Sequence, residues 1–371
     1  MTSKKTILFA VESLTVGGAE RVIVNLANQF NSETWNIHVA CLATAGELAA
    51  DLSPNVTLHC LNKKPGFDLG LVNKLRRLLK EVKPDIINTH LWTANTWLRA
   101  VNLNKIPIFV TEHSRDNWKP AHYKKIDKLL SFCTTRLIAV SQDVAAYYHA
   151  EIGISQSLIQ VILNGVDVLK YEKGDRQKIR EELKIPDDHF LLGMVGRMVT
   201  AKNYPRLIEA IALIKKTLPN IKCVIAGEGP ERAKIEQAIQ DKNLSDSVFI
   251  LGTRSDVKDI LAGLDVFTLS SDREGHPLTA LEAQVAGIPI VLTDVGGCKD
   301  AIVLGKKNDS LNGGIIVTPS ATHLADAIIE LLQNERKRKK MSQIALRYAK
   351  EQFSLERMIQ DYETLFLSAL S

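Results

Sequence analysis

Short apolar segments alternate with amphipathic segments along almost the whole chain, and the series occurs twice. In the first series the apolar segments, expected as strands, lie near residues 6–11, 36–42, 56–61, 85–89, 107–111 and 136–140. The second series begins at Phe190 and continues near residues 221–226, 247–251, 265–269, 289–293 and 314–317. Continuous apolar strands separated by helices are typical of parallel sheets covered on both faces. The pattern therefore predicts an α/β protein with two doubly wound, Rossmann-like sheets.

Helical periodicity and a polar stretch suggest the domain boundaries. Residues 71–82 place apolar side chains on one helical face and basic ones mostly on the other, and further helices are expected at 321–333, 336–350 and 354–370. A turn at 164–167 precedes a polar stretch to about residue 189, which is typical of a linker. Because 371 residues exceed one compact core, we expect domains at 1–170 and 185–353 with a ligand cleft between their facing sheets.

Charge and cysteine content exclude several classes of protein. The formal net charge of +5, from 47 basic and 42 acidic residues, is far too small to indicate binding to nucleic acid. The N-terminus does not fit a signal peptide, and no apolar run reaches the roughly 18 residues of a membrane-spanning helix. Five scattered cysteines without a C-x-x-C pair predict reduced thiols, no zinc site and a cytoplasmic protein.

The glycine-rich turns differ from those of two common classes of nucleotide-binding protein. Neither the G-x-G-x-x-G fingerprint of dehydrogenases nor the phosphate loop of nucleoside triphosphatases occurs. The first strand is followed instead by Gly17 and Gly18, which let the backbone approach a ligand. Residues 227–230 (Gly-Glu-Gly-Pro) lie between a strand and a helix, and a structural turn explains them as well as a nucleotide contact does.

Two glutamates mark the most informative stretch of the chain. Glu274 is expected in the loop after the strand at 265–269, and Glu282 on the second turn of a helix that begins near Pro277. The backbone N–H groups of residues 275–279 then form an anion site suited to a diphosphate. Two carboxylates eight residues apart in the sequence cannot share a proton or a metal from a single helical face. They are therefore expected to contact different parts of a long ligand. The alternative is that both are solvent-facing charges.

Two cations follow the first strand of the second series. Arg197 and Lys202 are expected at the same sheet edge as Glu274, because the carboxyl ends of parallel strands meet there. A guanidinium fork and a compact ammonium could together neutralise a leaving diphosphate. Taken alone, each is better explained as a surface cation.

Together these motifs resemble the retaining glycosyltransferases of the GT-B fold, in the group 1 or family four class that contains sucrose synthases, bacterial mannosyltransferases and lipopolysaccharide glycosyltransferases. The resemblance covers nearly the whole chain and rests on the order of its motifs: residues 17–21, 111–114, 164–167, 196–197 with 202–203, 227–230, 274 with 282, and 295–297. It implies an acceptor-binding N-terminal domain, a donor-binding C-terminal domain, and a C-terminal helix near 354–371 that packs back on the former.

The resemblance also implies roles for individual residues. Arg197 and Lys202 correspond to residues that bind the donor diphosphate, and Glu282 to one that holds the ribose hydroxyls. Glu274 corresponds to a donor-sugar contact, assisted by the backbone at Gly275, His276, Pro277 and Leu278. This chain has Gly-His-Pro where the family commonly has phenylalanine and glycine. Gly17 and Gly18 would approach the donor phosphate and acceptor, and His113 would face the anomeric centre, which completes a catalytic set of His113, Arg197, Lys202 and Glu274.

The implied reaction is sugar transfer from a UDP- or GDP-linked sugar with retention of anomeric configuration. The leaving phosphate can take the acceptor's proton, and no Asp-x-Asp metal motif is apparent, so neither a metal nor another cofactor is expected. Two alternatives stay open: a nucleotide-sugar epimerase of the same fold, and a non-catalytic two-domain sugar-binding protein. An epimerase would release nucleotide without an acceptor.

The acceptor is predicted less directly. The N-terminal motifs are similar to those of bacterial enzymes that extend lipid-linked saccharides or lipopolysaccharide, which implies cell-envelope polysaccharide assembly. The charge excess lies wholly in residues 1–170, which hold 19 basic and 14 acidic residues against 28 of each in the remainder. Basic groups at 63–83 and at Lys119, Lys124, Lys125 and Lys128, beside Phe67 and Trp118, could rest on anionic lipid at the inner face of the cytoplasmic membrane. A plain solvated face explains them equally well.

Overall fold

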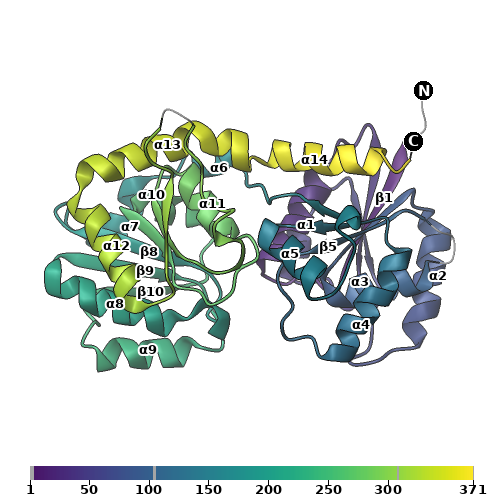
Figure 1. Ribbon diagram of the computed structural model, residues 1–371, viewed down its shortest axis with the longest axis horizontal. Coiled ribbons are helices and arrows are strands. Elements are labelled where there is room, and N and C mark those ends of the chain that lie inside the picture. Colours follow the sequence, from purple (N-terminus) through teal and green to yellow (C-terminus); the bar gives the residue numbers. More distant parts are fainter. Residues whose placement is uncertain (1–3, 103–105, 307–308, 371) are drawn as a thin grey trace. The chain divides into compact units, whose positions relative to one another are not determined.

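The computed structural model describes residues 4–102, 106–306 and 309–370, and the chain forms two compact units (Figure 1). The N-terminal unit comprises Met1–Asn164 with Leu355–Ser371, and the C-terminal unit comprises Gly165–Ser354. The stretch expected as a linker instead starts the C-terminal unit and contains α6 (Val168–Tyr171) and α7 (Arg176–Glu182). Its apolar residues Tyr171 and Ile179 are buried, which the polar composition of this stretch conceals.

The N-terminal unit is built on seven parallel strands in the order β3-β2-β1-β4-β5-β6-β7. They are β1 (Lys5–Val11), β2 (Trp35–Cys41), β3 (Val56–Cys60), β4 (Ile86–His90), β5 (Ile108–Glu112), β6 (Arg136–Ala139) and β7 (Ile159–Val161). The first six match the expected strands, whereas the short edge strand β7 was not among them.

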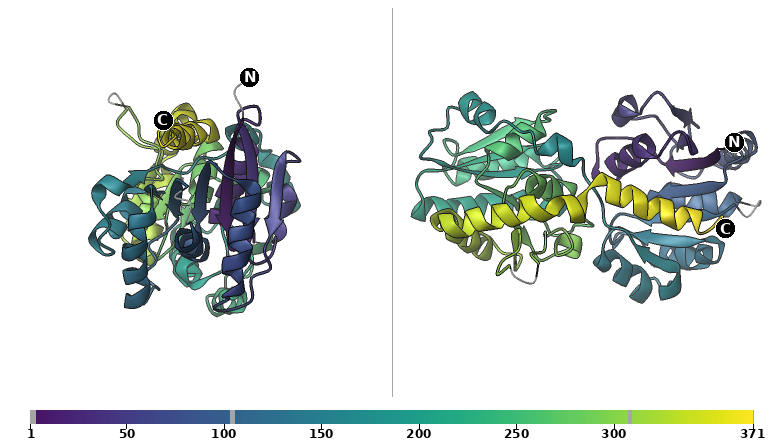
Figure 2. Two further views of the ribbon diagram at one scale, coloured as in Figure 1. Left: turned by 90° about the vertical axis from the view of Figure 1, so that its right-hand side faces the viewer. Right: turned by 90° about the horizontal axis from the view of Figure 1, so that it is seen from above.

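Helices cover both faces of this sheet. They are α1 (Gly18–Gln29), α2 (Gly70–Val82), α3 (Leu91–Val101), α4 (Ala121–Leu130), α5 (Gln142–Ala150) and α14 (Leu355–Leu367). Leucines of α2 and α3 pack against Leu8 and Ile87 on one face. On the other face the ring of Phe366 lies against Phe30 and Phe109, so the C-terminal helix α14 packs beside α1 (Figures 1 and 2).

The C-terminal unit contains six parallel strands in the order β10-β9-β8-β11-β12-β13. The strands are β8 (Phe190–Val195), β9 (Ile221–Ala226), β10 (Val248–Gly252), β11 (Val266–Leu269), β12 (Ile290–Thr293) and β13 (Gly314–Val317). The remaining helices are α8 (Tyr204–Thr217), α9 (Arg232–Asp241), α10 (Val257–Gly263), α11 (Leu278–Val285), α12 (Ala321–Gln333) and α13 (Glu335–Phe353). Both sheets confirm the predicted α/β class.

Each sheet reverses its strand order once, between β1 and β4 and between β8 and β11. In open parallel sheets, loops on either side of such a reversal leave a crevice at the carboxyl ends of the strands, where ligands bind. In the C-terminal unit these loops carry Arg197 and Lys202 after β8, and Glu274 after β11. In the N-terminal unit, Gly17 and Gly18 follow β1, and His90 ends β4. The topology thus places most predicted site residues at reversal points.

Candidate active site

Lys202 and Glu274 form an ion pair in the C-terminal unit. Lys202 ends a 3₁₀ turn (Thr200–Lys202) after β8, and its Nζ lies 2.6 Å from Glu274 Oε1. The hydroxyl of Ser271 donates to the same oxygen at 2.5 Å. Both charged side chains are largely buried, with 19% and 7% of their surfaces exposed. The pair is therefore held in one geometry at the sheet edge, and solvent and salt weaken its electrostatic attraction only slightly.

A glycine turn from another strand supports the backbone of Glu274. The N–H of Gly297 donates to the carbonyl of Glu274 at 3.2 Å. Gly296 has a φ of +51°, and a Cβ there would lie 1.9 Å from the same carbonyl oxygen. Only glycine fits this position, so the Val-Gly-Gly motif after β12 helps to fix the loop that carries Glu274.

The N-terminus of α11 leaves backbone donors available beside Glu274. No described residue accepts a hydrogen bond from the N–H of Gly275, Leu278 or Thr279. Pro277 caps the helix and has no N–H, so it cannot donate a backbone hydrogen bond to a nucleotide sugar. The imidazole Nε2 of His276 bonds to the carbonyl of Asp300 at 3.1 Å. That ring also packs against Phe353, so it is part of the hydrophobic core of this unit.

Arg197 lies two residues after the end of β8, and its side chain is exposed. Its guanidinium makes no hydrogen bond or ion pair with any described residue. The neighbouring turn is rigid, because Asn203 adopts a left-handed conformation and caps α8, while the hydroxyl of Tyr204 donates to the carbonyl of Gly196 at 2.7 Å. An uncommitted guanidinium on a fixed turn can bind an anion with a small loss of side-chain freedom.

Glu282 is buried on α11 and has a partner that the sequence did not reveal. The hydroxyl of Tyr171, on α6, donates to Glu282 Oε1 at 2.7 Å. Only 8% of Glu282 is exposed, so the interpretation of this residue as a solvent-facing charge is wrong. No sequence signal indicated Tyr171, because it lies within the stretch expected as a linker.

The Gly-Glu-Gly-Pro turn packs on the loop after β8. A Cβ on Gly227 would lie 2.0 Å from the carbonyl oxygen of Gly196, and one on Gly229 would lie 2.4 Å from that of Met198. The N–H of Met198 also donates to the carbonyl of Glu228 at 2.8 Å. These contacts provide a structural reason for both glycines: they let the β9 turn support the segment that carries Arg197.

In the N-terminal unit, Gly17 precedes α1 and Gly18 is its first residue. Gly17 has an extended backbone with a φ of −169°, so its conformation alone does not require glycine. The atoms nearest to an added Cβ belong to the flexible carboxylate of Glu20. Gly18 is exposed, which leaves its backbone accessible at the carboxyl end of β1.

His113 follows β5 and is linked to a second histidine. Its Nε2 lies 2.9 Å from His90 Nδ1, and the two rings are stacked. His90 Nε2 lies 2.8 Å from Asn88 Oδ1. Burial lowers the pKa of His113 to about 4 and holds the pKa of His90 well below its ordinary value, so both rings are neutral at pH 7. The sequence offered a signal for His90, since this residue directly follows the strand expected at 85–89 and ends β4 in the structure.

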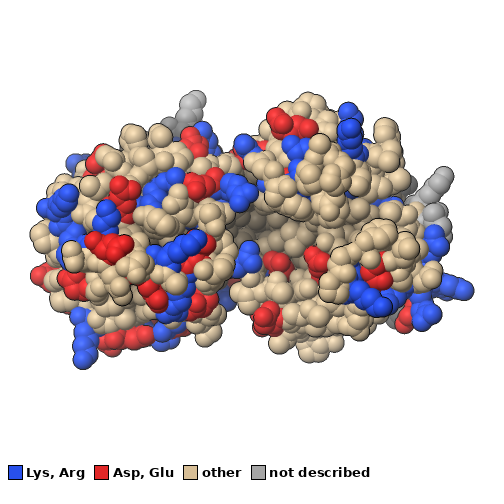
Figure 3. Space-filling view, turned by 90° about the horizontal axis from the view of Figure 1, so that it is seen from below, with Lys and Arg blue, Asp and Glu red and all other residues tan. Residues whose placement is uncertain are grey.

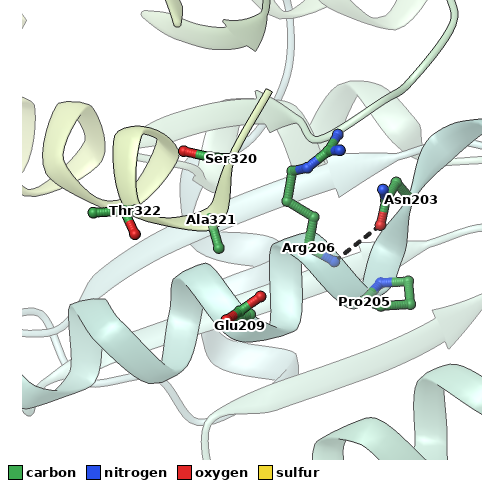
Figure 4. A pocket seen from close by; sticks show the side chains of 7 residues that line it. All are labelled: Asn203, Pro205, Arg206, Glu209, Ser320, Ala321 and Thr322. Carbon is green, nitrogen blue, oxygen red and sulfur yellow. Dashed lines mark hydrogen bonds between the residues drawn. The ribbon is translucent and has the colours of Figure 1, made fainter. Parts of the chain in front are cut away.

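A pocket of about 470 Å³ lies between the N-terminal ends of α8 and α12 (Figure 4). Its lining residues are Asn203, Pro205, Arg206, Glu209, Ser320, Ala321 and Thr322. None of the predicted site residues lines it. The Arg206 guanidinium is paired with Asp272 at 2.7 Å, so this pocket offers no uncommitted cation.

One member of the predicted basic face lies in the core of the N-terminal unit. Lys119 is 3% exposed, and its Nζ contacts Asp116 and Asp127 at 2.8 Å each. Its interpretation as a lipid-facing cation is therefore wrong. A charge run in the sequence cannot reveal which lysine meets acidic partners from other elements.

Comparison with known proteins identifies the family. Residues 175–348 match the family model described as Glycosyl transferases group 1, and residues 16–169 match Glycosyltransferase Family 4. The chain is 30% identical to UDP-Gal:alpha-D-GlcNAc-diphosphoundecaprenol alpha-1,3-galactosyltransferase of Escherichia coli, over 76% of this chain and 77% of that protein. This chain belongs to the group 1, family 4 glycosyltransferases.

Further similar proteins match this glycosyltransferase over nearly its whole length. It is 26% identical to N-acetyl-alpha-D-glucosaminyl L-malate synthase of Bacillus anthracis, over 96% of this chain and 95% of that protein. The fold is similar to that of HepE of Anabaena, solved in complex with UDP, with a TM-score of 0.85, 21% identity, and coverage of 98% and 100% of the two chains. The predicted GT-B fold class is confirmed.

The described part of the glycosyltransferase contains neither a metal-binding cluster nor a membrane-spanning helix. Within residues 4–102, 106–306 and 309–370, no three His, Cys, Asp or Glu side chains form a group that could hold a metal ion. Over the same part of the chain, no helix is both long and apolar enough to cross a membrane.

Proposed function

We propose that this glycosyltransferase transfers a sugar, with retention of configuration, from a UDP- or GDP-linked donor to a saccharide or lipid-linked saccharide during assembly of cell-envelope polysaccharide or lipopolysaccharide. The observation that carries the proposal is the group at the β8/β11 reversal: the Lys202–Glu274 pair, the exposed Arg197 and the open N–H groups that begin α11. The named activities of relatives, among them a galactosyltransferase that acts on a diphosphoundecaprenol-linked sugar, support the choice of donor and acceptor.

The proposed chemistry follows from where negative charge develops. As the glycosyl–phosphate bond lengthens, the sugar becomes oxocarbenium-like and the departing diphosphate gains charge. Arg197, Lys202 and the helix N-terminus stabilise that charge. Glu274 binds a hydroxyl of the donor sugar, and Glu282 accepts from the ribose hydroxyls. The departing phosphate takes the proton of the acceptor hydroxyl, so no protein nucleophile is required.

Donor and reaction type can be tested together. UDP-, GDP-, ADP- and dTDP-linked sugars are screened by thermal shift, and nucleotide release is then measured with and without saccharide acceptors. We expect binding of one donor class and release that depends on an acceptor. Release without any acceptor would indicate the epimerase, and sugar binding without release would indicate the non-catalytic protein. The anomeric proton coupling in the product reports retention, and an inverted product contradicts it.

Activity is expected to survive removal of divalent metal, because Arg197, Lys202 and backbone N–H groups supply the positive charge that a metal provides elsewhere. The measurement compares initial transfer rates after dialysis against EDTA with rates in added Mg²⁺ or Mn²⁺. A strict requirement for either added metal would contradict the proposal.

We also propose that the N-terminal unit binds anionic membrane surfaces. Phe67 and Leu69 are 79% and 69% exposed, and Arg76 and Arg77 are exposed on the helix that follows. In Figure 3, basic and acidic side chains are interspersed over the C-terminal unit at the left, and side chains of both signs also lie over the N-terminal unit at the right. A basic surface beside exposed apolar side chains is typical of peripheral attachment.

The wild-type protein is therefore expected to sediment with phosphatidylglycerol vesicles at low salt. Reversing two charges in Arg76→Glu/Arg77→Glu should weaken this binding at least about tenfold, since each basic residue contributes roughly 1 kcal/mol. The matched control is Arg336→Glu/Lys339→Glu, at exposed positions of α13 in the C-terminal unit. Equal binding by both double variants, or no binding by the wild type, would refute membrane attachment.

A further inference from the structure

Two buried side chains, Asn88 and His90, form a hydrogen-bonded series that ends at the partly exposed His113. Asn88 and His90 lie on β4 and are fully buried. His90 contacts Asn88 through one ring nitrogen and His113 through the other. The family resemblance implies that His113 faces the anomeric centre of the donor sugar, but it does not say whether the ring donates or accepts a hydrogen bond there. The partners along the series decide this question.

The amide of Asn88 has a fixed orientation. Its Nδ2 donates to the carbonyl of Phe109 at 3.1 Å and to the hydroxyl of Thr111 at 3.0 Å. In the reverse orientation the amide oxygen would face the carbonyl oxygen of Phe109, with no hydrogen between them. Asn88 Oδ1 therefore points to His90, and it can only accept.

The two imidazoles then have only one consistent arrangement of protons. His90 Nε2 must carry a proton, because its partner Asn88 Oδ1 is an acceptor. Since His90 is neutral and buried, its Nδ1 is unprotonated and accepts from His113 Nε2. His113 is neutral as well, so its single proton lies on Nε2 and its Nδ1 carries a lone pair. No described residue donates to that Nδ1.

We infer that Asn88 and His90 are positioning residues that hold His113 in its Nε2–H tautomer, so that His113 Nδ1 accepts a hydrogen bond from an uncharged sugar hydroxyl. The inference rests on the proposed function for the identity of the ligand. A lone pair at Nδ1 repels phosphate oxygens, so His113 contacts the sugar and does not bind the diphosphate. With a pKa of about 4 the ring is also a weak base near neutrality, so His113 orients the sugar and does not remove a proton.

The tautomer can be observed directly in the ligand-free protein. Long-range ¹H–¹⁵N correlation spectra of ¹⁵N-histidine-labelled protein distinguish protonated from unprotonated ring nitrogens, and His113→Gln identifies the signal of His113 among the nine histidines. At pH 7 we expect a protonated Nε2 and an unprotonated Nδ1. Addition of UDP-glucose, or of the donor found in the screen, should shift the Nδ1 resonance upfield as it accepts a hydrogen bond. A proton on Nδ1, or a charged ring at pH 7, would overturn the inference.

Variants separate positioning from simple packing. Asn88→Leu removes the acceptor, so His90 can reverse its tautomer and His113 should lose its single proton arrangement; transfer should then fall about tenfold. In His90→Gln the side-chain oxygen can accept from His113 and the amide can donate to Asn88, so the tautomer and most of the activity should persist. The matched control is His59→Gln, which makes the same replacement in the similar 2.9 Å His38–His59 contact of the same sheet and should leave transfer unchanged.

The outcomes also distinguish this inference from the proposed function. If His59→Gln and Asn88→Leu reduce transfer equally, or if the tautomer changes without any loss of transfer, the positioning role is wrong. If no nucleotide sugar supports transfer, the proposed function fails, whereas the proton arrangement in the free protein is still measured.

Discussion

Sugar transfer is expected to fall about 100- to 1,000-fold when Lys202 or Glu274 is replaced by alanine, while the protein stays folded. Lys202 supplies a charge that becomes valuable as the diphosphate departs, and Glu274 orients the donor sugar. Their separation of 2.6 Å also means that each substitution leaves the other charge without its main partner in a largely buried position. A lower melting temperature is therefore part of the expected result, but it must be separated from the loss of chemistry.

A double variant achieves that separation. Lys202→Met and Glu274→Gln each leave one unpaired charge, whereas the combined variant has neither charge and should regain most of the thermal stability. Activity should stay low in all three, because the leaving group has lost its cation, the sugar has lost its carboxylate, or both. Melting is followed by circular dichroism, and transfer by nucleotide release with saturating acceptor.

The matched control is Lys215→Ala, which removes an ion pair of 2.7 Å with Asp246 on the surface of the same unit. We expect almost unchanged activity and stability, since exposed pairs contribute about 0–1 kcal/mol. Near-normal turnover in Lys202→Ala or Glu274→Ala would refute the assigned site. Recovery of transfer in the double variant would show that the pair has only a structural role.

The second large effect is expected on stability, from Lys119→Met in the N-terminal unit. Lys119 contacts Asp116 and Asp127, and Arg99 lies 2.7 Å from the same Asp127. Burial opposes the charge on Lys119, but the surrounding carboxylates raise the pKa of its ammonium above the ordinary value. Burial also disfavours the charged form of the neighbouring Glu112 and raises the pKa of its carboxyl group to about 7. Removing the central cation leaves Asp116 without its ion pair and Asp127 with Arg99 alone, which should lower the free energy of unfolding by about 3–5 kcal/mol.

The chain provides a convenient probe for this prediction. All four tryptophans, Trp35, Trp92, Trp97 and Trp118, lie in the N-terminal unit, so urea unfolding followed by tryptophan fluorescence reports on that unit. The control Lys125→Met changes an exposed lysine of α4 and should alter the unfolding free energy by less than about 0.5 kcal/mol. Similar unfolding midpoints for the two variants would show that the buried lysine contributes no more than a surface one.

Much of the fold could be predicted because its signals are local. The apolar runs at 6–11 and 221–226 indicate buried strands by their own composition, and they correspond to β1 and β9. Four leucines of the predicted helix at 71–82 are buried in α2, as the periodicity indicated. Edge strands and short helices carry weaker signals, which explains why β7 was missed and why α6 and α7 were interpreted as a linker.

The sequence by itself determined the α/β class, the family, and the placement of Arg197, Lys202 and Glu274 on loops at one sheet edge. Only the tertiary structure decided which side chains meet: Glu274 with Lys202, Glu282 with Tyr171, and His113 with His90. The physical reason is that hydrophobic periodicity is read from neighbours along the chain, whereas ion pairs, burial and proton positions depend on groups brought together from distant segments. Lys119 shows the difference, because a lysine among surface lysines in the sequence is the buried centre of a carboxylate cluster in the folded unit.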